Sequence, residues 1–237
     1  MRDLRKTLFA ALFISLLGTA QAEGPPAASA ELADFRTVSV QSKVDKLFES
    51  GEFERAYFIY RNELAPIGDK YAQYMVGYMH LMGMGVEEDE VRASAWYRLA
   101  AEREYPEFVA IRKQVLKSLD DEDLQRSDAK YIELRQQYSD LVLSMRQLRR
   151  DYDELSEPKT GSRLPGRGSP VMIIDPTRRV GMTGDSYYRK TELRFRTRLD
   201  YVTDTLGIER VTGQVTEKNL RELQDRVEEH VSQVDDR

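Results

Sequence analysis

The chain has 237 residues and a formal net charge of −5, and 32% of its residues are charged. Such a length allows one main domain and an appendage, and the mildly acidic balance argues against a general nucleic-acid-binding protein. No cysteine occurs in the sequence, which excludes disulfides, thiolate metal sites and lipid attachment through an N-terminal cysteine.

The first 22 residues have the three parts of an export signal. A basic start is followed by a short apolar core and by a small-residue cleavage site, Ala20-Gln21-Ala22. We therefore expect residues 1–22 to be a signal peptide, the alternative being an uncleaved N-terminal anchor. Export predicts a periplasmic protein with no stable membrane insertion after cleavage. Residues 23–35, which include two prolines, are expected to form a flexible leader.

Two apolar stripes at helical spacing flank Gly51 and predict a helix-turn-helix. Their members are Val44, Leu47 and Phe48 before the glycine, and Phe53, Ala56, Tyr57, Tyr60 and Leu64 after it. Pro66 and Gly68 end the second helix. We expect this hairpin to be a degenerate first repeat, because one repeat cannot bury its apolar faces alone.

Residues 72–104 predict two short antiparallel helices around a glycine turn, and the rest of the chain is organised around them. Gly83 and Gly85 stand where a tight turn needs positive φ. Asp89 is placed to cap the second helix. The second helix has one apolar stripe, formed by Ala93, Trp96, Tyr97, Ala100 and Ala101. Its small residues would let the two helix axes approach closely.

These residues resemble the Sel-one-like repeat, a relative of the tetratricopeptide repeat, over one unit. The matches are Ala72, Tyr74, Gly77, Gly83, Gly85, Val86, Asp89, Ala93, Trp96, Tyr97, Ala100 and Ala101. The chain departs from the family pattern where Val76 replaces leucine, His80 replaces tyrosine and Glu104 replaces the closing glycine. The resemblance implies an adaptor that holds or assembles other proteins.

One stripe of the first repeat helix provides the candidate partner-binding residues, which are Met75, Tyr78, Met79 and Met82. They fall at i, i+3, i+4 and i+7, on a face where Sel-one-like repeats usually place polar residues. Methionine is adaptable and recurs at promiscuous binding surfaces. The alternative is that another helix covers this stripe, which would make it part of the core.

Beyond Glu104, Pro106 is suited to the first turn of a helix, and Asp120 or Asp121 begins the longest helical run. Its apolar residues alternate by three and four, at Tyr131, Leu134, Tyr138, Leu141, Met145, Leu148, Tyr152 and Leu155. This heptad pattern predicts one long helix, which either closes the repeat core or pairs as a coiled coil in a homodimer. We favour internal packing, since tyrosine at most a positions suits a two-stranded coil poorly. The repeat domain is thus expected to span residues 36–155.

A linker rich in proline and glycine is predicted over residues 156–185. It is too long and irregular to be an ordinary connection within a compact domain. Within it, residues 171–174 form an apolar island, which predicts a short strand or extended segment docked on its own domain. The alternative is a strand lent to the sheet edge of a partner.

The remaining residues, 186–237, predict a C-terminal helical segment. Residues 186–206 fit either a helix or a strand, and Asp185 as a cap with Gly207 as a stop favours the helix. In that helix a basic row forms a solvated face or a contact for an anionic partner; its members are Lys190, Arg194 and Arg198. The last helix begins after Thr216, where Val215 can staple onto Leu220.

No catalytic constellation, cofactor site or metal site is predicted. The two histidines lie far apart in sequence; His80 is expected to be packed or hydrogen-bonded, and His230 solvated. The acidic run at residues 87–90 lacks the spacing of a calcium loop. Residues 164–169 lack the Gly-Lys-Ser/Thr ending of a phosphate-binding loop.

The sequence therefore predicts an all-α protein, a short α-solenoid of helix hairpins with a long heptad-patterned helix and a C-terminal helical pair. We expect an exported, non-enzymatic adaptor or scaffold that binds other proteins in the cell envelope. The alternative is a structural oligomer assembled through the heptad helix at residues 131–155.

Overall fold

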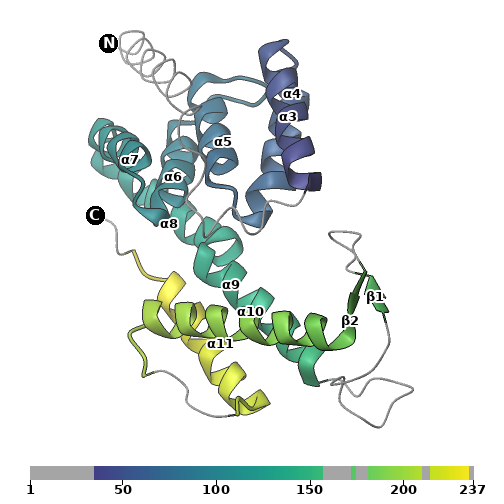
Figure 1. The fold of residues 1–237 in the computed structure, drawn as a ribbon. Coiled ribbons are helices and arrows are strands. Elements are labelled where there is room, and N and C mark those ends of the chain that lie inside the picture. The colour runs from purple at the N-terminus through teal and green to yellow at the C-terminus, as the bar shows by residue number, and fades with distance from the viewer. Residues whose placement is uncertain (1–34, 157–171, 175–180, 210–213, 235–237) are drawn as a thin grey trace. The chain divides into compact units, whose positions relative to one another are not determined.

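The computed structural model describes residues 35–156, 172–174, 181–209 and 214–234, and most of these are helical (Figure 1). The predicted all-α class is confirmed. Contacts within the chain divide it into two compact units, with the division between Lys130 and Tyr131. The predicted signal peptide and most of the predicted leader and linker lie outside the described residues. Within the described ranges, no helix combines the length and the apolar character needed to span a membrane.

The first unit is built from helix hairpins joined by short turns. Its α-helices are α3 (Phe35–Glu49), α4 (Phe53–Ile59), α5 (Lys70–Met82), α6 (Glu90–Ala100), α7 (Pro106–Ser118) and the start of α8 (Asp121–Tyr138). Short π and 3-10 turns lie in two of the connections: η1 (Tyr60–Leu64) and η2 (Ala65–Ile67) between α4 and α5, and η3 (Ala101–Arg103) between α6 and α7. This is the helical, solenoid-like arrangement that the sequence predicted.

The first hairpin, α3 and α4, turns at Gly51, whose φ is 80°. Its two helices run antiparallel, because Phe48 contacts Phe53 across the turn with ring centroids 5.3 Å apart, while further out Tyr60 donates a hydrogen bond to Asp45 at 2.9 Å. After α4 the helical run continues through η1 and η2 and ends at Gly68, where φ is 83°. The predicted first hairpin is therefore present, and both glycines act as expected.

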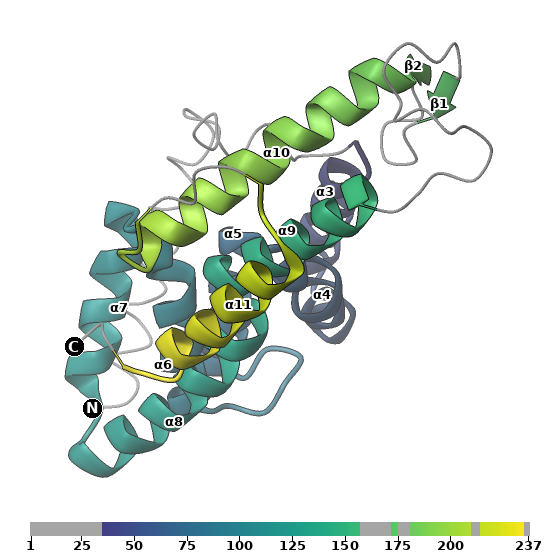
Figure 2. The ribbon, with the colours of Figure 1, turned by 90° about the horizontal axis from the view of Figure 1, so that it is seen from below.

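In the described part of the second unit, the main body is a helix bundle made of α9 (Asp140–Ser156), α10 (Gly184–Thr205) and α11 (Glu217–Val231), which Figure 2 shows from below. One apolar cluster holds the bundle together, formed by Leu141, Val142, Met145 and Leu148 of α9, Phe195, Leu199 and Val202 of α10, and Leu220, Leu223, Val227 and Val231 of α11. The heptad face of α9 thus packs inside the chain. It packs on the C-terminal helices, however, and the second unit takes in residues 131–155, which the sequence had placed in the repeat domain.

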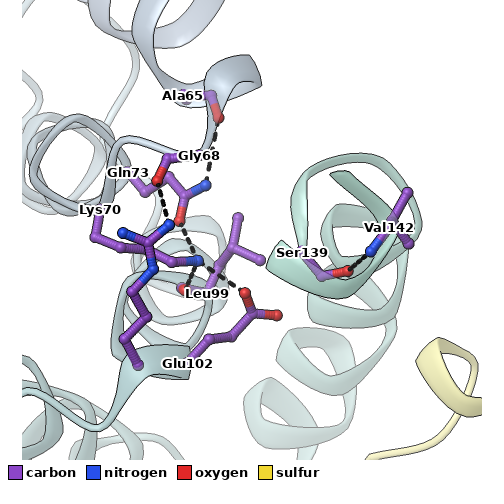
Figure 3. Close-up of polar contacts among 9 residues, drawn as sticks. Ala65, Gly68, Lys70, Gln73, Leu99, Glu102, Ser139 and Val142 are labelled. Atoms are coloured by element: carbon purple, nitrogen blue, oxygen red, sulfur yellow. Dashed lines mark hydrogen bonds and ion pairs between the residues drawn. The ribbon is translucent and has the colours of Figure 1, made fainter. Parts of the chain in front are cut away.

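The predicted single long helix is wrong, because the structure breaks it at Ser139 into α8 and α9. The Ser139 side-chain oxygen accepts a hydrogen bond from the Val142 amide at 3.2 Å (Figure 3). A serine in this position satisfies one of the amides that the first turn of a helix leaves unpaired. Ser139 therefore starts a new helix, although the apolar pattern continues across it.

The C-terminal helices begin at threonine caps. The side chain of Thr183 accepts from the Ser186 amide at the start of α10, so the ambiguous segment is a helix, but its cap lies two residues before the predicted Asp185. Gly207 ends it with φ 64°. Thr216 caps α11 in a reciprocal capping box with Asn219, which confirms the predicted start.

Part of the predicted linker forms a small hairpin instead. Strands β1 (Met172–Ile174) and β2 (Gly181–Thr183) pair antiparallel, with Ile173 opposite Met182. The apolar island is thus a short strand that pairs within its own chain, as expected.

Candidate functional site

The hairpin of α5 and α6 is the best-defined local structure of the first unit. Across it, the backbone oxygen of His80 accepts from the Asp89 amide at 2.9 Å, and further out Tyr74 and Tyr97 lie 5.4 Å apart between ring centroids. Each helix starts at an aspartate: Asp69 accepts from the Ala72 amide and Asp89 from the Arg92 amide, both at 2.8 Å. The predicted antiparallel pair and the Asp89 cap are therefore present.

Three glycines determine how closely the elements of this hairpin approach. A Cβ atom added at Gly77 would lie 3.2 Å from the Ala93 carbonyl oxygen, so α5 and α6 cross with almost no space between them. Gly83 and Gly85 have φ of 65° and 69°. At Gly85 an added Cβ would also lie 2.4 Å from the Phe53 carbonyl carbon. The turn is therefore pressed against the start of α4.

Buried aromatic rings fill the space beside this crossing. Tyr74 contacts Tyr97 and also stacks on Phe108 of α7, at 5.5 Å between centroids. Burial raises the pKa of the Tyr74 and Tyr97 hydroxyls well above the ordinary value. These hydroxyls therefore stay protonated near neutral pH, and the rings contribute packing rather than charge.

A buried lysine joins the start of α5 to the end of α6. Figure 3 shows Lys70 Nζ between three acceptors, the Gln73 Oε1 and Leu99 carbonyl oxygens at 3.1 Å each and Glu102 Oε2 at 2.7 Å. The Gln73 amide nitrogen in turn donates to the Ala65 carbonyl at 3.3 Å. All three protons of the ammonium are thus used. The network fixes the repeat hairpin and leaves the ammonium no proton for another ligand.

A second buried ion pair ties α6 to α8. Arg98, whose side chain is 1% exposed, donates to Asp128 Oδ1 at 2.8 Å. Next to it the Ser94 hydroxyl donates to the Ser127 hydroxyl at 2.7 Å. Sequence patterns did not indicate this pair, because Arg98 stands among the alanine and aromatic positions of the stripe and its partner is 30 residues away.

The predicted partner-binding stripe lies mostly in the interior. Met75, Tyr78 and Met79 are 1%, 5% and 0% exposed, whereas Met82 is half-buried. Phe48 of α3 lies 6.3 Å from Tyr78 between ring centroids, so the first hairpin helps to cover the stripe. This placement corresponds to the alternative in which a neighbouring helix makes the stripe part of the core. A role for these four residues in binding stays a prediction.

The predicted basic row of α10 has a role that the sequence did not show. Arg194 and Arg198 both pair with the buried carboxylate of Asp151 on α9, the first of them at 3.6 Å. Two of the three basic residues therefore hold the bundle together. Another pair, Arg149 with Glu217 at 2.7 Å, joins α9 to α11, and it lowers the pKa of the Glu217 carboxyl.

An open hollow of about 730 Å³ runs along α3, and the sequence analysis did not single it out. Its lining residues are Val38, Ser39, Ser42, Lys43, Lys46, Leu47, Ser50 and Glu52. Val38 is 51% exposed, while Lys43 and Lys46 lie at the surface beside it. The small serines on one helix face are the sequence signal that could have indicated the hollow. Its surface combines apolar side chains, hydroxyls, two cations and the Glu52 carboxylate, which pairs with Arg55.

Within the described ranges, no three side chains of histidine or carboxylate type come together in a way that could hold a metal ion. His80 is buried and its Nε2 lies 3.1 Å from the Tyr57 hydroxyl, in line with the expected packed role. His230 is half-buried on α11 rather than fully solvated. The two histidines belong to different units.

In a comparison with protein families, the Sel1 repeat model matches residues 70–105. This range is the α5–α6 hairpin with the turn that follows it. Comparisons with curated proteins and with solved structures each gave no significant match. The Sel1 repeat implies a helical-repeat scaffold for protein–protein interaction.

Proposed function

We propose that this chain, in which residues 70–105 form a Sel1 repeat, is an exported adaptor that holds a protein partner in the cell envelope and catalyses no reaction. The observation that carries the proposal is the repeat itself, whose architecture is that of a scaffold for protein contacts. Its helices are capped, closely crossed and fixed by buried ion pairs.

The hollow along α3 is the surface that we propose for the partner. Its exposed Val38 offers apolar contact, and Lys43 and Lys46 add two cations on the same helix. A partner segment with apolar side chains and nearby carboxylates would complement both features. Charge complementarity of this kind mainly sets the rate and specificity of association. Binding should therefore weaken as the salt concentration rises.

Export is supported by the pattern of residues 1–22 and predicts a mature chain that starts at Glu23. Fractionation of cells followed by determination of the N-terminal residue tests this part. A chain that keeps Met1 and stays with the cytoplasm would contradict it.

Site-specific photo-crosslinking in the intact cell envelope tests the proposed surface. A photoreactive residue at Val38 should capture a defined partner. The same residue at Phe58, which is 60% exposed on α4 of the same unit, serves as the matched control and should not. The captured protein should then bind the purified mature chain, and Lys43→Glu with Lys46→Glu should weaken binding at least tenfold. Equal capture at both positions, or an unchanged affinity, would overturn the proposed surface.

Homodimerisation through residues 131–155 stays the alternative prediction. In α9 the apolar face that such a dimer would need is occupied by α10 and α11. Sedimentation of the mature protein at several concentrations separates the two ideas: a monomer at every concentration removes the oligomer.

A further inference from the structure

His80 occupies a buried position where α4, the end of α5 and the glycine turn come together. Its side chain is 2% exposed, and its ring meets that of Tyr57 edge-on at 5.5 Å between centroids. Nε2 lies 3.1 Å from the Tyr57 hydroxyl, and the His80 carbonyl accepts from the Asp89 amide. Nδ1 is buried and has no hydrogen-bond partner among the described residues. The His80 side chain therefore joins α5 to α4, and its backbone joins α5 to the turn.

The neutral ring suits this position, but the protonated ring does not. If Nε2 carries the proton, it donates to the Tyr57 oxygen, and Nδ1 is a bare acceptor. A second proton must then go onto Nδ1, which makes no hydrogen bond to the described residues of the folded chain. Placing a positive charge in a buried site carries a desolvation cost, which the Glu87 backbone offsets only in part.

The charged groups around His80 come from every element packed on it. Arg61 follows α4, and Arg92 lies in the first turn of α6; both oppose a further positive charge. The Asp89 carboxylate and the backbone of Glu87, both on the turn, favour it. Tyr57 contributes its hydroxyl. Burial is the largest influence, and it lowers the pKa of His80 below the ordinary 6.5.

We propose that His80 is an acid-sensitive latch, whose neutral ring holds α4 against α5 through Tyr57 and releases it when the ring gains a proton. Unfolding or local opening lets the ring reach water, where it binds the proton at its ordinary pKa. The stabilisation is therefore complete above pH 6.5 and is lost as the pH falls below that value. The proposal does not depend on the identity of any partner or on the surface along α3.

The matched variants follow from the sequence, which has only two histidines. His80→Tyr places at this position the residue that the repeat pattern has there and removes the titrating group. His230→Gln removes the other histidine, which lies in the second unit. With wild type and His230→Gln, the unfolding constant should rise by up to about tenfold per pH unit as the pH falls from 6.5 towards 5.5. His80→Tyr should lack this rise.

Two measurements on folded protein keep the test independent of whether His80→Tyr folds. An NMR titration of the ring protons, assigned with His230→Gln, should give His80 a pKa below 6.5. Hydrogen exchange at pH 5.5 and 7.0, corrected for the intrinsic rate, should show faster opening of α4 and α5 at the lower pH, with α10 as the internal reference. A His80 pKa at or above 6.5, equal pH dependence in wild type and His80→Tyr, or unchanged exchange in α4 and α5 would each overturn the latch.

Discussion

Lys70 and Glu102 form an ion pair in the interior of the first unit, with Nζ and Oε2 2.7 Å apart and side-chain exposures of 3% and 15%. The pair spans the repeat hairpin from the start of α5 to the turn after α6. Because the ammonium also donates to Gln73 and Leu99, its charge is fully hydrogen-bonded without water. Removing either partner should therefore lower the free energy of unfolding by more than the net contribution of the ion pair, because the remaining charge is left buried and uncompensated.

Glu102→Gln should lower the free energy of unfolding by about 3 kcal/mol, because it leaves a buried ammonium without its counter-charge. Urea denaturation at neutral pH measures the change. The double variant Lys70→Met with Glu102→Gln should be less destabilised than Glu102→Gln alone. The control is Asp123→Asn, which breaks an exposed pair with Arg126 and should cost no more than about 1 kcal/mol. Equal losses in the buried and exposed pairs would argue against this account.

Gly85→Ala should destabilise the chain more than Gly51→Ala. Both glycines have positive φ, so each substitution carries a backbone strain of about 1–2 kcal/mol. Only at Gly85 would the new Cβ meet backbone, 2.4 Å from the Phe53 carbonyl carbon, whereas nothing lies within 4 Å at Gly51. The clash should add about 1–3 kcal/mol, which thermal unfolding of the two variants will resolve. Similar melting temperatures would mean that the turn and α4 are not pressed together.

Glu104→Gly should stabilise the protein by about 1 kcal/mol. In the described part of the chain, Glu104 is the one residue other than glycine with positive φ, at 55°. Glycine takes this conformation without the steric cost that a side chain brings. The lost pair with Arg112 matters little, since the Glu104 side chain is 68% exposed. Glu104→Ala is the control, because it loses the same pair and keeps the strain; only the glycine variant should gain stability in denaturant titration.

Met75→Glu and Met82→Glu should separate core from surface in the predicted stripe. Met75 is 1% exposed, so a carboxylate there would be buried and unpaired, and the loss should exceed about 3 kcal/mol. Met82 is half-buried, and its carboxylate can reach water, so we expect less than about 1 kcal/mol. Circular dichroism during denaturation measures the free energy of unfolding of each variant. If both variants fold normally and neither binds the partner, the stripe is a docking surface after all.

The local signals of the repeat could be predicted because each depends on one residue and its neighbours. Gly83, Gly85 and Asp89 act as expected, and so do Pro106 at the start of α7 and Thr216 at the start of α11. Positive φ, side-chain caps and the missing proline amide are local properties of the backbone. They do not depend on what packs against the helix, so a single sequence is enough to place them.

The errors concern which elements pack together. The apolar spacing from Tyr131 to Leu155 runs on through Ser139, yet the chain leaves one helix there and the serine hydroxyl caps the start of the next. Periodicity also shows that Met75 and Met79 share a face, but it does not show that both are buried or that Phe48 of the first hairpin contacts their neighbour Tyr78. The Arg98–Asp128 pair joins residues 30 positions apart, a separation at which sequence patterns carry no information.

The packing of α9 on α10 and α11 has a practical meaning for shortened forms of the protein. A chain cut after Ser156, at the end of the repeat domain that the sequence suggested, would expose Leu141, Val142, Met145 and Leu148 to water. Burying one such side chain stabilises the folded state by about 1.5–3 kcal/mol. The fragment would therefore expose a contiguous apolar surface and tend to aggregate. Deleting α10 and α11 should therefore lower the solubility of the protein, even though both helices lie outside the Sel1 repeat.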